Sequence, residues 1–347
     1  MKKLSGHESI SLQEQFLLLA DYCENNEVDH DQYGNGKFLN QFEEEVANLT
    51  GMEAGLFMPS GVMAQLIAVR IYSDQLKSKY FACHPTCHLL LHEEDAYKTL
   101  HNLEVEECGH ADKVTTLSDL QALENDISSL ILELPLRHLG GDLPSWDELV
   151  AQKKYCKENK IKLHLDGARI FECQNYYGKS VKEIAADTDS LFLSFYKGFG
   201  SSSGSMLLGG KEFIEEAKIW LRRHGGNLFQ LYPLAIAAKL NFDSRLDKFN
   251  QYVEKAHEIG EVLNTLPSVT VLPYPVKTNM LHFEFPKSKA HLQNQMKDYK
   301  EKGFDIGMGI WLEEPKGVSR LELSVGDATL RLSKEEIREL FQALLES

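Results

Sequence analysis

Short apolar runs alternate along this chain with longer segments in which apolar residues recur every three or four positions. The runs Leu130–Leu136 and Leu191–Leu193 are almost wholly apolar and show no alternation with polar residues. Such runs predict strands that are buried on both faces, as in a parallel sheet. Helical spacing is found in Phe42–Leu49, Trp146–Glu158, Lys211–Arg223, Lys289–Lys302 and Lys334–Leu345. The pattern predicts an α/β fold with a mainly parallel sheet.

A lysine stands where one of these strands ends. The stretch Ser194–Gly204 reads SFYKGFGSSSG and follows the run Leu191–Leu193 directly. In open α/β sheets, ligand chemistry collects at the carboxyl ends of strands, so Lys197 is placed to meet a ligand. Partial burial can lower the pKa of such a lysine enough for it to form an imine with a carbonyl group. A solvated loop lysine is the alternative that this stretch leaves open.

A carboxylate ends the preceding strand. Residues Ile161–Arg169 read IKLHLDGAR, and a crossover to the next strand would bring Asp166 and Lys197 to one edge of the sheet. A carboxylate beside an imine-forming lysine suits pyridoxal phosphate (PLP), because it keeps the pyridine nitrogen protonated. Arg169 is suited to a phosphate or a carboxylate. The alternative is a tight turn with Arg169 in a surface ion pair.

Three motifs in a fixed order carry a family resemblance: HLDGARIF, SFYKGFGSSSGSMLLGGKEFI and RRHGGNLFQ. They resemble the threonine aldolase and β-eliminating lyase family of fold type I PLP-dependent enzymes, from about Asp31 to Phe341. The resemblance implies that Lys197 carries the cofactor and that Asp166 holds its pyridine nitrogen. It also implies that Arg169 lies over the cofactor, near the carboxylate of an amino acid substrate.

A phosphate site is predicted where the segment AGLFMPSGVMAQ passes from a strand to a helix. Glycine lets a backbone approach an anion closely, and the free N–H groups of a helix start suit phosphate. Ser60, Gly61 and Val62 are therefore candidate cofactor ligands, and they match the family's SGT. Val62 replaces the threonine, so only its backbone N–H could serve. A simple helix cap is the alternative.

The segment Cys83–His92 reads CHPTCHLLLH and could suggest a metal site. No second cluster completes a tetrahedral ligand set in the sequence, so we expect no metal. By resemblance, His88 stacks on the cofactor ring, and an imidazole there could take part in proton transfer. The alternative is a buried histidine with satisfied hydrogen bonds.

The segment after Leu130–Glu133 departs from the family. The family has Glu-Asn-Thr-His there, with a histidine suited to act as a general base. In this chain Glu133 is retained but Leu134 and Pro135 follow it, and Arg137 and His138 come slightly later and could take over. This departure weakens a specific prediction of aldol cleavage.

Two further residues are assigned to the substrate by resemblance. Tyr33, followed by Gly34, matches loosely a short segment that approaches the active site in the family. Arg320 falls where the family carries a second arginine for the substrate carboxylate, although an ordinary strand arginine is the alternative. The family's early Ser-Asp-Thr stretch is not visible.

We expect an N-terminal segment at 1–41, a large PLP-binding domain at 42–245 and a small α/β domain at 246–347. A long helical stretch from about Tyr232 to Leu263 would bridge the domains. The small domain would alternate strands with helices, the strands at Val269–Leu272, Met280–Phe285 and Arg320–Ser324.

The composition argues against some classes of binding partner. The 52 acidic residues outnumber the 37 lysines and arginines, and a net charge of −15 argues against binding to nucleic acid or an anionic membrane. No apolar run approaches the length of a membrane span, and the start of the chain does not read as a secretory signal. Six scattered cysteines suit reduced thiols in a cytoplasm.

The predicted function is PLP-dependent aldol cleavage of a threonine-like β-hydroxy-α-amino acid to glycine and an aldehyde. β-Elimination, transamination or racemisation with the same cofactor remains open, as does a protein of this fold that has lost its chemistry. The resemblance also implies a homodimer or homotetramer.

Overall fold

The computed structural model describes residues 2–313 and 317–346. Contacts within the chain divide it into two compact units. The first comprises residues 11–134 and 144–246, and the second comprises residues 1–10, 135–143 and 247–347. The short segment 135–143, which follows a strand of the first unit, therefore belongs to the second.

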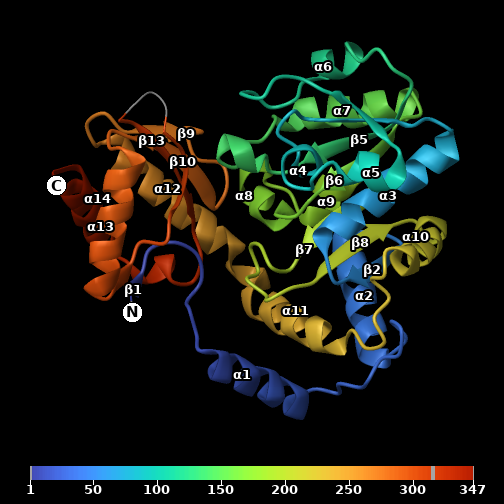
Figure 1. Ribbon diagram of the computed structural model, residues 1–347, viewed down its shortest axis with the longest axis horizontal. Coiled ribbons are helices and arrows are strands. Elements are labelled where there is room, and N and C mark those ends of the chain that lie inside the picture. The colour runs from blue at the N-terminus through green and yellow to red at the C-terminus, as the bar shows by residue number, and fades with distance from the viewer. Residues whose placement is uncertain (1, 314–316, 347) are drawn as a thin grey trace. The chain divides into compact units, whose positions relative to one another are not determined.

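A seven-stranded sheet forms the centre of the first unit (Figure 1). Its order is β2 (Ala54–Met58), β8 (Ser205–Gly209), β7 (Ser190–Ser194), β6 (Lys162–Asp166), β5 (Ile127–Glu133), β3 (Tyr80–Cys83) and β4 (Glu104–Glu107). Neighbouring strands from β7 to β4 pair in parallel, whereas β8 is antiparallel to both β2 and β7. The predicted α/β fold with a mainly parallel sheet is confirmed.

Alternate residues of the strands face two different helical layers. Leu56, Phe192 and Leu207 pack with α3 (Gly61–Leu76) and α10 (Lys211–Arg223). Phe57 points to the other face, where it meets Phe42 of α2 (Lys37–Thr50). Both faces are covered, which explains why the strands read as unbroken apolar runs.

The remaining helices of the first unit lie between these strands in the sequence, except for the first, which precedes them, and the last, which follows them. They are α1 (Leu12–Asn25), α4 (His88–Leu91), α5 (Ala96–His101), α6 (Leu117–Gln121), α7 (Trp146–Glu158), α8 (Gln174–Tyr177), α9 (Val181–Ala185) and α11 (Tyr232–Arg245). Helices α1, α6 and α9 begin with a capping box, in which a serine or threonine and an acidic residue three positions later each bind the other's backbone N–H.

The described residues of the second unit form a four-stranded antiparallel sheet and three α-helices. The sheet order is β12 (Gly309–Glu313), β13 (Ser319–Ser324), β10 (Met280–Phe285) and β9 (Thr270–Leu272). The helices are α12 (Phe249–Asn264), α13 (Lys289–Glu301) and α14 (Lys334–Glu346), and β1 (Lys2–Lys3) pairs with β11 (Phe304–Asp305). Phe283, Phe285 and Phe341 form its aromatic core.

The long helical stretch expected from Tyr232 to about Leu263 is helical but divided. Helix α11 ends at Arg245, a 3₁₀ turn follows at Leu246–Lys248, and α12 begins at Phe249. The two helices bury their apolar residues in different units, so one continuous apolar stripe does not serve both. Within residues 2–313 and 317–346, we find no helix with the length and apolar character needed to cross a membrane.

Candidate active site

The predicted site residues of the first unit gather at one edge of the large sheet. Asp166 is the last residue of β6, and Lys197 follows β7 by three positions. Strands β6 and β7 pair in parallel, with Asp166 opposite Phe192. Strand β2 runs in the same direction as β7, because both are antiparallel to β8, so Ser60 also follows a strand at this edge.

Asp166 is a buried carboxylate, only 4% exposed. Burial raises its pKa, while the backbone N–H of Ala168, the charge of His88, the Gln65 amide and the charge of Arg169 lower it. The Ala168 N–H lies 3.1 Å from Oδ1, and Gln65 donates to Oδ2. Gly167 fits between strands because a Cβ there would lie 2.4 Å from Leu191. Sequence reasoning missed Gln65, a polar residue within an apolar helix.

Aromatic residues anchor the loop that carries Lys197. Phe195 and Phe199 flank the lysine, and their rings pack 6.1 Å apart. Phe195 also contacts Phe42 and Phe57 in the core, with ring centroids 5.1 and 6.1 Å away. With its neighbours buried, the half-buried Lys197 is held at the sheet edge, and its amine lies 5.3 Å from the Tyr196 ring centroid.

The predicted phosphate site has the geometry of an open helix start. Helix α3 begins at Gly61, and the Ser60 side chain makes no capping hydrogen bond to it. A Cβ on Gly61 would lie 2.6 Å from both Phe192 Cζ and the Tyr196 hydroxyl, so only glycine fits. Val62 packs its side chain against the core around Cys83 and Cys87, which leaves its backbone for other contacts.

Two buried hydroxyls follow Lys197 in the loop between β7 and β8. The buried Oγ atoms of Ser201 and Ser203 have no hydrogen-bond partner among the described residues. Ser205, which follows them, pairs with Met58 at the end of β2. Unsatisfied buried hydroxyls are costly, so a ligand oxygen is their natural partner.

His88 is paired with an acid that the sequence did not reveal. Its Nδ1 lies 2.9 Å from Oε1 of Glu93, whose side chain is fully buried. Burial raises the pKa of Glu93, opposed by the hydrogen bond and charge of His88. With Nδ1 held by the carboxylate, the other ring nitrogen is the one that can accept a proton. The spacing of five residues across a short helix carried no signal that periodicity could detect.

The neighbouring His84 has a structural role. Its Nδ1 lies 2.8 Å from the Thr86 hydroxyl, and Nε2 lies 2.8 Å from the carbonyl oxygens of His110 and Lys113. Among residues 2–313 and 317–346, no group of three or more metal-ligating side chains is arranged to hold an ion.

The predicted substrate residues are distributed over both units. Arg169 is half-buried, follows the Asp166 strand, and its charge acts on Asp166. Tyr33 contacts Phe229, at a ring distance of 5.4 Å. Arg320 belongs to the second unit, where it binds Glu284 on the neighbouring strand at 2.9 Å. Roles for Tyr33 and Arg320 with a substrate stay predictions.

The segment after β5 is tied into the second unit. Arg137 donates two hydrogen bonds, of 3.0 and 2.9 Å, to the carboxylate of Glu322. The Arg137 charge, together with a hydrogen bond from His282, helps to lower the pKa of Glu322 to about 2 despite its burial. A guanidinium held in this way cannot accept a proton, so Arg137 does not replace the missing general base.

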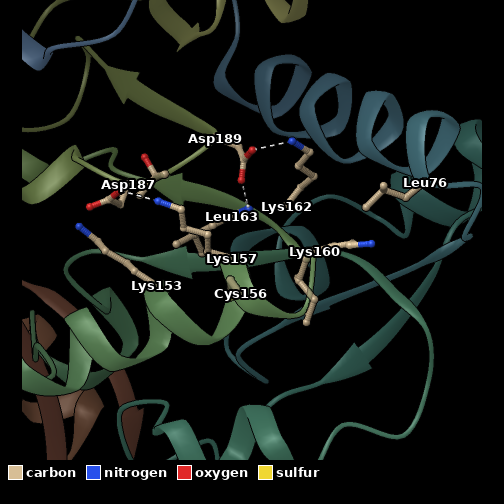
Figure 2. Close-up of a pocket in the computed structure, with 11 residues that line it drawn as sticks. Leu76, Lys153, Cys156, Lys157, Lys160, Lys162, Leu163, Asp187 and Asp189 are labelled. Carbon is tan, nitrogen blue, oxygen red and sulfur yellow. Dashed lines mark hydrogen bonds and ion pairs between the residues drawn. The ribbon is translucent and has the colours of Figure 1, made fainter.

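A separate cavity lies at the opposite ends of the same strands. Residues of α7 and of the starts of β6 and β7 line it (Figure 2), and its volume is about 370 Å³. Lys162 binds Asp189 at 2.7 Å, and Lys157 binds Asp187 at 3.4 Å. Lys153 is buried and donates to the carbonyl oxygens of Ile184 and Ala186. The sequence did not predict this cavity.

The fold is the fold type I of PLP-dependent enzymes. Serine palmitoyltransferase of Sphingomonas wittichii matches with a TM-score of 0.72 over 99% of this chain and 86% of its own, at 13% identity, which shows the fold alone. A Listeria monocytogenes protein described as an L-allo-threonine aldolase matches with a TM-score of 0.92 at 36% identity, covering 99% of this chain and 96% of its own.

Sequence relatives define the family more narrowly. Low-specificity L-threonine aldolase 1 of Arabidopsis thaliana is 29% identical over 80% of this chain and 81% of its own length. The beta-eliminating lyase family model matches residues 19–286. The chain therefore belongs to the beta-eliminating lyase family, as its motifs predicted.

Proposed function

We propose that this protein is a PLP-dependent lyase that cleaves threonine or a similar β-hydroxy-α-amino acid to glycine and an aldehyde. The observation that carries the proposal is the buried Asp166 at the end of β6, beside the strand that leads to Lys197. The relatives described as threonine or allo-threonine aldolases support this substrate class.

The residues at the sheet edge fit PLP. Lys197 offers the amine for its aldehyde, and Asp166 offers a carboxylate for its pyridine nitrogen. The helix start at Ser60, Gly61 and Val62 suits its phosphate. The unpartnered hydroxyls of Ser201 and Ser203 are further donors for phosphate oxygens.

When bound, PLP supplies an electron sink that stabilises the negative charge left on Cα as the Cα–Cβ bond breaks. Asp166 would accept a hydrogen bond from the pyridinium N–H, so that the proton and the positive charge stay on the nitrogen. Arg169 binds the substrate carboxylate and thereby orients the bond to be broken.

His88 is the base in this proposal. Its Nε2 accepts the proton of the substrate's β-hydroxyl group, and Glu93 holds Nδ1 and stabilises the imidazolium that forms. This assignment supplies the proton acceptor that Leu134 and Pro135 removed from the end of β5. The aldehyde then leaves, and return of the proton from His88 to Cα would give glycine.

A second copy of the chain would complete the protein as a homodimer or homotetramer. Helix α1 buries none of its residues, and Leu12, Phe16 and Leu17 are 74%, 69% and 61% exposed. Apolar exposure on that scale favours an interface.

All six cysteines are free thiols, which favours a reducing compartment such as the cytoplasm.

Incubation with L-threonine and L-allo-threonine tests the function. We expect acetaldehyde and glycine in equal amounts, and an absorption band of bound PLP that Lys197→Ala abolishes. Lys162→Ala, at the other end of the sheet, should retain both. Pyruvate from L-serine without acetaldehyde from threonine would instead assign β-elimination, and a protein that binds no PLP would contradict the proposal.

A further inference from the structure

A buried line of polar side chains runs between α3 and the sheet and ends at Asp166. Tyr72 Oη lies 2.7 Å from Ser190 Oγ, which lies 2.7 Å from Nδ1 of His164. His164 Nε2 lies 2.9 Å from Oε1 of Gln65, and the Gln65 amide nitrogen bonds to Asp166 Oδ2. Each of these side chains is at most 4% exposed.

Regular structure puts these groups in line. Gln65 and Tyr72 are seven residues apart on α3, which places them on one helix face. His164 and Ser190 are directly opposite each other on β6 and β7. His164 and Asp166 alternate with Leu165, so both point to the same face of the sheet.

Chemistry gives the line one direction. The Tyr72 hydroxyl has a single proton and, among the described residues, a single partner, Ser190. If Tyr72 donates to Ser190, the Ser190 proton is free to be donated to Nδ1 of His164. His164 must then carry its proton on Nε2 and donate it to Oε1 of Gln65. The amide N–H groups of Gln65 therefore face Asp166. In the reverse direction, Asp166 would be protonated and the Tyr72 proton would be buried without an acceptor, which is costly.

We propose that Tyr72, Ser190, His164 and Gln65 form a one-way hydrogen-bond chain that delivers an N–H group to Asp166 and holds its carboxyl group ionised. The role for the cofactor rests on the proposed function, because an ionised carboxylate is what the pyridine nitrogen of PLP requires. These four residues are positioning residues, since they act on the ligand through Asp166.

The hydrogen-bond chain offsets the effect of burial on Asp166. Burial raises the pKa of Asp166, so an isolated carboxyl group here would tend to become neutral. An N–H donated to the charged form opposes that tendency. His164 stays neutral and able to transmit the direction, since burial lowers its pKa to about 3.

The tautomer of His164 tests the chain without reference to catalysis. In the full-length protein labelled with ¹⁵N-histidine, we expect His164 to be protonated at Nε2 and unprotonated at Nδ1 from pH 8 to pH 5, with and without added PLP. Tyr72→Phe removes the donor that sets the direction, so a mixture of tautomers is expected. Protonation at Nδ1 in the wild type, or an imidazolium within this range, would overturn the proposal.

A pair of glutamine variants tests the consequence for the cofactor. Gln65→Leu should weaken PLP binding by about 10- to 100-fold, the range expected for loss of one charge-assisted hydrogen bond. Gln152→Leu is the control, because Gln152 is also fully buried in the same unit but bonds to Thr115. Equal PLP affinities in the two variants would contradict the chain.

The outcomes separate the two proposals. If the wild type binds PLP and Gln65→Leu binds it as tightly as Gln152→Leu does, the hydrogen-bond chain is rejected and the proposed function stands. A wild type that binds no PLP would reject the proposed function, whereas the His164 tautomer would still decide the direction of the chain.

Discussion

The two ends of β6 and β7 carry charges of the same kinds in opposite settings. At the amino ends, Asp189 pairs with Lys162, and the two side chains are 32% and 36% exposed. At the carboxyl ends, Asp166 is almost fully buried, and its hydrogen bonds come from neutral groups on Gln65 and Ala168. One edge holds screened ion pairs, whereas the other holds a carboxylate whose charge the protein must actively support.

The difference teaches where chemistry is to be expected. A solvent-exposed ion pair contributes little, about 0–1 kcal/mol, because water screens it and side-chain entropy opposes it. A buried carboxylate without a countercharge in direct contact is expensive, and such groups persist where a ligand uses them. A cavity lined by lysines is therefore the weaker candidate for catalysis, although Figure 2 shows it clearly.

Replacing the two aspartates should break the comparison most visibly. Asp166→Asn removes the charge that supports the pyridine nitrogen, so kcat for threonine cleavage should fall by about 100- to 1,000-fold. Asp189→Asn should change kcat by less than about two-fold, because it alters a partly exposed ion pair and the asparagine can still accept the hydrogen bond from the Leu163 N–H. Steady-state kinetics with saturating PLP measure both, and equal losses would remove the distinction between the edges.

The buried Glu93 gives a smaller effect. Glu93→Gln keeps an acceptor for His88 but removes the charge that stabilises its protonated form, so kcat should fall by about 10- to 100-fold. Because burial raises the pKa of Glu93, its charge costs stability at neutral pH, and the variant should unfold at the same or a higher denaturant concentration. Glu183→Gln, which alters an exposed cap on α9, should leave kcat unchanged. A Glu93→Gln enzyme with full activity would dismiss the assigned base.

Two buried histidines, His164 and His101, differ in their hydrogen bonding, and the pH dependence of the free energy of unfolding tests that difference. His164 has two hydrogen-bond partners, whereas His101 is 3% exposed and its ring nitrogens have none among the described residues. Burial lowers the pKa of His101 to about 4, from about 6.5 in the unfolded chain. Between pH 6.5 and 4 the unfolded state therefore binds a proton that the folded state does not. As the pH is lowered through this range, the free energy of unfolding should decrease by up to about 1.4 kcal/mol per pH unit for this histidine.

His101→Phe should flatten that slope and should leave threonine cleavage intact. The phenylalanine can retain the ring contacts with Trp220 and His224, which lie 5.5 and 4.9 Å away. Urea unfolding at pH 4.5 to 7 measures the effect. A slope identical to that of the wild type would show that His101 does not titrate as its burial requires.

The sequence predicted the strand ends well and the supporting contacts poorly. Lys197 and Asp166 could be placed at one sheet edge because apolar runs mark the strands and direct parallel pairing brings their ends together. Glu93 and Gln65 could not be found, since neither periodicity nor spacing shows which surface a helix turns toward a buried carboxylate or imidazole. The run Ser205–Leu208 predicted a strand, but the antiparallel direction of β8 was hidden, because a buried strand reads the same in either direction.

By itself, the sequence determined the α/β class, the lysine and carboxylate at neighbouring strand ends, and the family to which the chain belongs. Only the tertiary structure decided which neutral groups surround Asp166 and that His88 pairs with Glu93. It also decided that residues 135–143 belong to the second unit. The reason is physical: apolar patterning records what is buried, whereas hydrogen bonds between distant residues depend on the distances and angles that folding creates.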